Sequence, residues 1–192
     1  MSIKKYVYVA LPLILILVSC GQSLPNDSLR TINQGEIIGI ESDDNTFAWL
    51  GIPFAEPPVG NLRWKAPVAF VDEDFRIYPK ENNFCHQEIG GQIQEIDQAG
   101  SEDCLYLDIR APHGNRDNLP VMFWIHGGGN TSGHKDFYNF SELVKRKDVI
   151  VVSPNYRLGP LGFFTHPAIQ DFHSGIDKTS NFGILDLVLA LK

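Results

Sequence analysis

The sequence predicts an α/β fold, in which a small antiparallel hairpin precedes a mixed, mostly parallel sheet with helices on its faces. Two short runs of apolar β-formers, Val121–Ile125 and Val149–Val152, are typical of strands buried on both faces. The alternation of apolar and polar residues from Leu105 to Ile109 indicates a half-buried strand. The apolar segment that starts at Asn181 predicts a helix that is buried around almost its whole circumference.

The amino-acid composition and charge limit which class of protein this can be. A chain of 192 residues that is 43% hydrophobic and 20% charged is long enough for one globular domain and too apolar for disorder. The formal net charge of -7, with no basic stripe to offset it, excludes a nucleic-acid partner, because phosphate binding needs clustered Lys and Arg.

Residues 1–19 predict a signal peptide. Lys4 and Lys5 precede an apolar stretch from Tyr6 to Val18, which is shorter than the roughly 20 residues needed to span a bilayer. We therefore expect an exported protein.

The end of this leader predicts an anchor. Leu17-Val18-Ser19-Cys20 resembles the lipobox of bacterial lipoproteins, which implies a lipid on Cys20, attachment to a membrane and a place in the bacterial cell envelope. An ordinary signal peptide and a secreted protein are the alternative. The polar residues 20–29 suit a tether, and the folded domain is expected over residues 30–192.

The cysteine count fits export. The chain has three cysteines, and if Cys20 carries lipid, Cys85 and Cys104 are free to pair in an oxidising compartment. A disulfide there would stabilise the fold by roughly 3 kcal/mol; two unpaired thiols are the alternative. His86 beside Cys85 raises the question of a metal, but a zinc site needs several well-spaced ligands, so we expect neither a metal nor a cofactor.

The strands and helices are expected in a definite order. Two β-rich runs, 35–40 and 46–52, are separated by turn-forming residues and predict the hairpin. Four prolines between Gly51 and Pro67 exclude helix, so this segment should run extended over the surface, with Arg63 and Trp64 as its anchors. The remaining elements are expected as strands at 104–111, 120–125 and 148–153 and as helices near 139–147 and from 181.

A glycine triplet follows the strand that begins at Val121. Gly127, Gly128 and Gly129 lack Cβ, so the backbone can adopt positive φ and bring its N–H groups close to a ligand. Adjacent backbone N–H groups that are free to donate can bind an anion. A flexible turn is the alternative, and the preceding strand and His126 favour the anion site.

His126-Gly-Gly-Gly129 after a central strand resembles the oxyanion-hole motif of α/β-hydrolase lipases and esterases. The proline-rich stretch from Gly51 to Trp64 is similar to the N-terminal pattern of the type-B carboxylesterase/lipase family, which includes bacterial esterases and the cholinesterases. Three further stretches resemble patterns of the same family, and they are Glu102-Asp-Cys-Leu-Tyr-Leu-Asp108, Asn155-Tyr-Arg-Leu-Gly-Pro-Leu-Gly-Phe163 and Asn181-Phe-Gly-Ile-Leu-Asp186. The resemblance covers the chain from about Gly35 to its end.

This resemblance implies the N-terminal portion of an α/β-hydrolase fold that acts on small-molecule carboxylic esters. It implies that Gly128 and Gly129 donate N–H groups to the oxyanion, while His126 and Gly127 support the loop. It also implies a disulfide between Cys104 and the upstream Cys85. His126 is not expected to be the catalytic base, because the base of the family lies further along the chain.

The nucleophile is missing from the sequence. The family carries it in Gly-x-Ser-x-Gly, but Asn130 precedes Ser132 and Phe172 precedes Ser174 where the first glycine should stand. We therefore expect the nucleophile, acid and base outside this chain, which would be an inactive N-terminal part. Departures from the family pattern fall at Arg110, Leu187 and Asn130, and the last would add a polar amide to the acyl pocket.

A non-catalytic binding or adhesion protein is the alternative function, because some members of the family have lost catalysis. The intact glycine triplet favours the enzyme, since an adhesion surface has no use for aligned amides.

Overall fold

The computed structural model describes most of the chain after the leader. The described ranges are 28–32, 35–42, 45–72, 75–77, 84–89, 97–114 and 117–192. The predicted signal peptide, Cys20 and all but the last two residues of the tether lie outside these ranges. No helix among the described residues is long and apolar enough to cross a bilayer.

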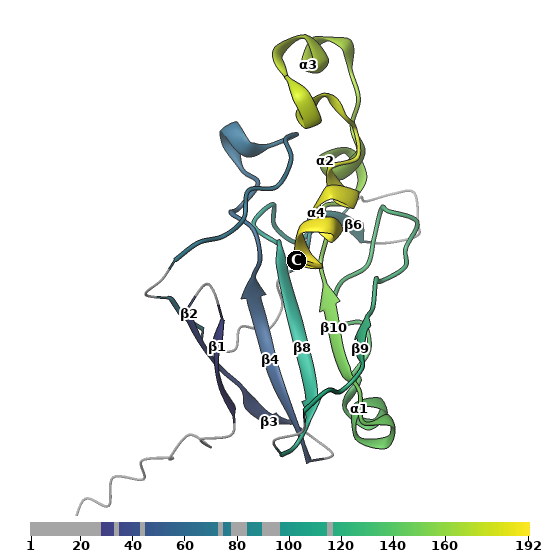
Figure 1. The fold of residues 1–192 in the computed structure, drawn as a ribbon. Coiled ribbons are helices and arrows are strands. Elements are labelled where there is room, and N and C mark those ends of the chain that lie inside the picture. The colour runs from purple at the N-terminus through teal and green to yellow at the C-terminus, as the bar shows by residue number, and fades with distance from the viewer. Residues whose placement is uncertain are drawn as a thin grey trace, which may run out of the picture.

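A five-stranded mixed sheet forms the centre of the molecule, with strand order β3-β4-β8-β10-β9 (Figure 1). Its strands are β3 (Ile40–Ser42), β4 (Thr46–Pro53), β8 (Tyr106–Pro112), β9 (Val121–Phe123) and β10 (Ile150–Pro154). The predicted α/β class, the mixed sheet and the antiparallel hairpin are confirmed. Within the described residues, β3–β4, β4–β8 and β8–β10 pair antiparallel and β10–β9 pair parallel, so this part of the sheet is mixed but mostly antiparallel, whereas the sequence predicted a mostly parallel one.

The predicted first strand of the hairpin, 35–40, is divided between two sheets, which corrects the sequence-based assignment. Residues 35–38 form β2, which pairs with β1 (Leu29–Ile32) and β5 (Phe75–Ile77), whereas the hairpin partner of β4 starts at Ile40. The break falls at Gly39, where the Trp49 indole lies 2.8 Å from the position that a Cβ would take. A further small sheet joins β6 (Gln87–Ile89) to β7 (Asp97–Ala99).

Strand β4 lies at the centre of the hydrophobic core, because every one of its residues is buried. Phe47, Trp49 and Ile52 pack with Leu105 and Leu107 around β8. An irregularity in the β4–β8 register falls between Trp49 and Ile52 and is typical of a β-bulge. The core is therefore centred on β4 and β8, two strands that the sequence predicted.

The described helices lie at both ends of the sheet. They are α1 (Ser141–Lys147), α2 (Gly159–Phe163), α3 (Pro167–Phe172) and α4 (Phe182–Ala190), with short 3₁₀ turns at Gly60–Leu62 and Gly175–Lys178. Helices α2, α3 and α4 gather where β4 and β10 end (Figure 1). The sequence predicted α1 and α4, but it missed α2 and α3, which are too short to establish an apolar period.

The sequence predicted that helix α4 is buried around almost its whole circumference. In the structure it is buried on one face only. Phe182 and Asp186 are buried, but Ile184, Val188 and Leu191 are exposed to 45%, 49% and 68%. An apolar residue is buried only where another element covers it, and α4 has α2 as its neighbour on one side. The helix begins after Asn181, whose side chain makes no capping hydrogen bond.

The proline-rich segment from Gly51 to Pro67 is held in place by the two residues expected to anchor it, Arg63 and Trp64. Arg63 makes two hydrogen bonds of 2.6 Å to the carboxylate of Glu102, and Trp64 Nε1 donates to Pro160 O at 2.9 Å. A planar guanidinium that binds both oxygens of a carboxylate fixes orientation as well as distance. This segment is therefore fastened to the stretch before β8 and to the start of α2.

Candidate active site

The glycine loop begins directly after β9. Trp124 N still donates to Val152 O at 2.8 Å, so the sheet pairing continues one residue beyond Phe123, the last residue of the strand, and then the chain turns away. Gly128 and Gly129 have φ of +110° and +62°. The sequence allows positive φ at all three glycines; Gly128 and Gly129 adopt it, and Gly127 does not. A Cβ at Gly128 would collide with the carbonyl of Ser132, so a side chain at this position has no room.

The turn is closed by hydrogen bonds to one carbonyl. Gly128 O accepts from Thr131 N at 3.1 Å, from Ser132 N at 3.2 Å and from the Thr131 hydroxyl at 3.0 Å. The residues Gly127, Gly128 and Gly129 are themselves exposed. No described residue accepts a hydrogen bond from their N–H groups, so these amides are available to a ligand.

His126 lies beneath this loop as a buried residue. Its Nδ1 lies 2.9 Å from Gly127 O, and because a carbonyl only accepts, Nδ1 carries the hydrogen. The ring stacks on Tyr156, with centroids 4.5 Å apart, and burial lowers the pKa of His126. The His126 ring is therefore tied to the loop backbone through Nδ1.

Tyr156 and Asn130 connect the loop to the end of β10 and the start of α2. The Tyr156 hydroxyl lies 3.2 Å from His126 O and 3.4 Å from Asn130 Oδ1. Asn130 O accepts from Gly159 N at 2.7 Å. The left-handed conformation of Asn130, with φ of +62°, is one that Asn adopts more readily than most residues.

The glycine loop borders two cavities. One, of about 430 Å³, is lined by His126, Gly127 and Gly128 together with the aromatic rings of Trp124, Phe137 and Tyr138. The other, of about 440 Å³, is lined by Gly129 and Asn130 together with Phe163 and Phe164. Both volumes fall in the range of small-molecule sites, and each cavity combines aromatic rings with glycines and polar side chains in its lining.

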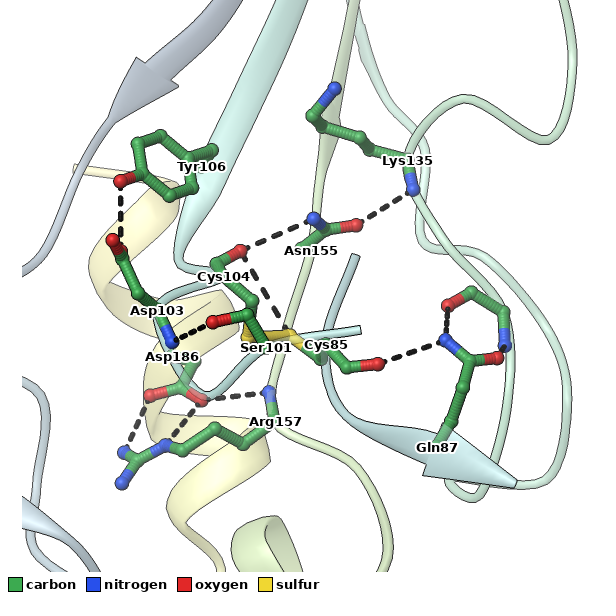
Figure 2. Close-up of a disulfide and its surroundings, with 11 residues drawn as sticks. Cys85, Gln87, Ser101, Asp103, Cys104, Tyr106, Lys135, Asn155, Arg157 and Asp186 are labelled. Carbon is green, nitrogen blue, oxygen red and sulfur yellow. Dashed lines mark hydrogen bonds and ion pairs between the residues drawn. A yellow bond between two sulfur atoms is a disulfide. The ribbon is translucent and has the colours of Figure 1, made fainter. Parts of the chain in front are cut away.

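The predicted disulfide between Cys85 and Cys104 is confirmed, and both residues are buried (Figure 2). Asn155 joins this region to the end of the glycine loop. Its Nδ2 donates to Cys104 O at 3.2 Å, and its Oδ1 accepts from Lys135 N at 2.8 Å. Asn155 thus links the disulfide to the segment that follows the glycine loop.

A buried charge cluster, which no sequence pattern predicted, follows the loop. Lys135 Nζ lies 3.0 Å from the carboxylate of Asp108 and within 2.9 Å of both oxygens of Asp136. Burial, with the neighbouring Asp136, raises the pKa of Asp108 to about 7 against the opposing charge of Lys135. Burial acts upward on the pKa of Asp136 as well, but its hydrogen bond with Asp108 and the charge of Lys135 bring the net shift down.

A model of the carboxylesterase family matches residues 26–192. The chain belongs to the carboxylesterase family. It is similar to the fumonisin B1 esterase of Sphingopyxis macrogoltabida, at 41% identity over 85% of this chain and 30% of that protein. It is also similar to the para-nitrobenzyl esterase of Bacillus subtilis, at 38% identity over 84% of this chain and 33% of that protein.

The solved structure of a thermophilic PNB esterase has the same fold over this region of the carboxylesterase chain. It aligns with a TM-score of 0.71 and 35% identity, covering 86% of this chain and 34% of the esterase. The chain therefore spans about a third of the length of these relatives.

Proposed function

We propose that the glycine loop is the oxyanion hole of a carboxylic ester hydrolase, with the N–H groups of Gly128 and Gly129 as its donors. This proposal rests on two successive glycines at positive φ, whose exposed N–H groups have no hydrogen-bond acceptor among the described residues. The aromatic cavities on either side offer places for the two halves of a small ester. Membership of the carboxylesterase family supports this assignment.

The loop contributes to one stage of ester hydrolysis. When a nucleophile adds to the ester carbonyl, the carbonyl oxygen becomes an anion in a tetrahedral intermediate. Two amides fixed before the reaction stabilise that charge without reorganising, and one such donor is worth about 10²–10³ in rate. Because the chain has no Gly-x-Ser-x-Gly, we propose that the serine, acid and base come from residues outside these 192.

Asn130 gives this site a substrate preference of its own. It lines the cavity beside Gly129, where its amide adds hydrogen-bonding capacity to an aromatic wall. Asn130 Oδ1 already lies 3.4 Å from the Tyr156 hydroxyl, so a polar or oxygen-bearing acyl group would accept from its Nδ2, whereas a purely alkyl chain offers no acceptor. We infer that the parent enzyme favours small esters with a polar acyl side.

The test compares two glycines of similar conformation. Gly128 has φ of +110° and no room for a Cβ, whereas Gly114 has φ of +94° and open space around it. In a protein that joins this sequence to a segment supplying the serine, the acid and the base, Gly128→Ala should lower kcat for p-nitrophenyl acetate by about 10²-fold with little change in KM. Gly114→Ala, which imposes comparable backbone strain, should leave kcat near the parent value.

The 192-residue chain provides the second arm. Purified by itself, it should hydrolyse p-nitrophenyl acetate no faster than buffer, because aligned amides cannot form an acyl-enzyme. Turnover by this chain alone, or an undiminished kcat in folded Gly128→Ala, would defeat the proposal.

We also propose that the protein is held on a bacterial envelope through lipid on Cys20. The support is the leader sequence and the lipobox resemblance at its end. The disulfide fits an oxidising compartment, where such bonds persist.

A further inference from the structure

Gln87, the first residue of β6, binds the backbone of Gly133 with both ends of its side-chain amide (Figure 2). Oε1 accepts from Gly133 N at 2.8 Å, and Nε2 donates to Gly133 O at 3.0 Å. An amide has one donor end and one acceptor end, so this pairing fixes both the position and the orientation of Gly133. It also leaves a single consistent orientation for the Gln87 amide, because carbonyls only accept and N–H groups only donate.

The same amide is tied to the disulfide. The second hydrogen of Nε2 is donated to Cys85 O at 3.0 Å, and Cys85 is bonded to Cys104 just before β8. The backbone on either side of Cys85 is also held, since His86 N donates to Ser101 O and Ser101 N donates to Phe84 O, each at 3.1 Å. Gln87 therefore extends toward the glycine loop from a covalently fastened base.

Gly133 in turn restricts the conformation of the glycine loop. Its φ is +114°, and a Cβ there would collide with His126 Nδ1 and lie 2.5 Å from Gly127 O. The residues before it, Thr131 and Ser132, bond back to Gly128 O. A displacement of Gly133 therefore moves the contacts that shape the turn around Gly128.

From these contacts we infer that Gln87 is a positioning residue of the glycine loop, and that it couples the Cys85–Cys104 disulfide to the placement of the Gly128 and Gly129 amides. The inference rests on the proposed function only for its effect on catalysis. Donors in an oxyanion hole act because they are fixed in advance, so loosening the loop lowers their value in the transition state.

Gln87→Met tests the inference because it keeps the length of the side chain and removes its hydrogen bonds. Gln170→Met is the matched control, since Gln170 is exposed on α3 and its side chain bonds only the Thr165 hydroxyl, at 3.1 Å, among the described residues. Amide hydrogen exchange, followed residue by residue by NMR in the 192-residue chain, is the readout. Should Gln87→Met fail to fold, Gln87→Asn keeps the amide but draws it back by one methylene and carries the same test.

The informative amides are those of Thr131 and Ser132, because their acceptor, Gly128 O, does not touch Gln87. We expect them to exchange at least about threefold faster in Gln87→Met and at the parent rate in Gln170→Met. Faster exchange at Gly133 alone would show only the loss of its own hydrogen bond and would overturn the inference.

Reduction tests the coupling to the disulfide. Dithiothreitol gives two electrons and two protons to the Cys85–Cys104 bond, which becomes two thiols while the reagent closes to a cyclic disulfide. We expect reduction to speed exchange at Thr131 and Ser132 in the parent and to add little in Gln87→Met, because both changes remove the same constraint. Additive effects would reject the coupling.

Kinetics supply a separate arm. In a protein that joins this sequence to a segment supplying the serine, the acid and the base, Gln87→Met should lower kcat about tenfold and leave KM within about twofold, since the amides act on the transition state. Exchange is measured without substrate. Faster exchange, together with no esterase activity in the joined protein, would therefore retain the positioning role and reject the proposed function, whereas unchanged exchange would reject the positioning role even if the joined protein is an active esterase.

Discussion

Asp108 shows at the scale of one residue how burial makes stability depend on pH. Its folded pKa is about 7, raised from 3.8 mainly by burial, although Gly51 N and Lys135 bind its carboxylate. Between about pH 4 and pH 7 the unfolded chain has lost this proton and the folded chain keeps it. The contribution of Asp108 to stability is therefore full below pH 4 and is lost as the pH rises through 7.

Asp108→Asn should remove this dependence, because an amide does not titrate in this range. We expect the free energy of unfolding of Asp108→Asn, relative to the parent, to rise between pH 4 and pH 8 by on the order of 2 kcal/mol. Urea unfolding at each pH measures the difference, in which the opposing titration of His126 cancels. A difference that stays constant with pH would show that the shift is absent.

At the scale of one element, α4 is attached to the sheet by a buried ion pair. Asp186 on α4 accepts hydrogen bonds from the Arg157 guanidinium at 2.7 and 2.9 Å and from Arg157 N at 3.0 Å (Figure 2). Burial raises the pKa of Asp186, and its bonds to Arg157 oppose that rise. Removing one partner leaves the other as an unpaired buried charge.

Asp186→Ala should accordingly destabilise the fold by about 3–5 kcal/mol. Glu142→Ala is the matched control, because Glu142 pairs with Arg146 on α1 with both side chains exposed, at 63% and 71%. An exposed pair of this kind is worth about 0.5 kcal/mol or less. Denaturant midpoints of the two variants decide the point, and equal losses would contradict this account of α4.

The leader is the second element with its own prediction. If Cys20 carries the lipid, Cys20→Ala should release the protein into the soluble fraction, because the multiple acyl chains of a lipoprotein are what hold it on a membrane. Fractionation of cells that express the parent and the variant measures this. A variant that stays as firmly bound as the parent would rule out the lipobox.

The whole molecule carries an apolar surface on α4. Ile184, Val188 and Leu191 are all exposed on this helix, whereas Val71, exposed to 70%, belongs to an extended segment far from it in sequence. Neighbouring apolar side chains favour association between molecules more than a scattered one does. We expect the double variant Ile184→Glu with Val188→Lys to have a higher monomer fraction than the parent in size-exclusion chromatography. The control, Val71→Glu, should have little effect. Equal elution of the parent and both variants would contradict this expectation.

The sequence by itself determined those features that local chemistry specifies. Uniform apolar runs placed β9 and β10, alternation placed β8, and the absence of a Cβ at Gly128 and Gly129 predicted their positive φ. Hydrophobic periodicity and glycine stereochemistry act within a few residues, so they can be read along the chain. The patterns shared with the carboxylesterase family added the pairing of Cys85 with Cys104, a contact between residues 19 positions apart.

Only the tertiary structure decided the rest. It divided residues 35–40 between two sheets at Gly39, because the Trp49 indole occupies the space beside that glycine. It also brought Gln87 to Gly133, which lies 46 positions further on, and Asp108 to Lys135, which lies 27 positions further on. A lone Gln or Lys in a polar stretch has the same local pattern whether it faces water or binds a distant backbone, so its partner is fixed only when the strands around it have paired.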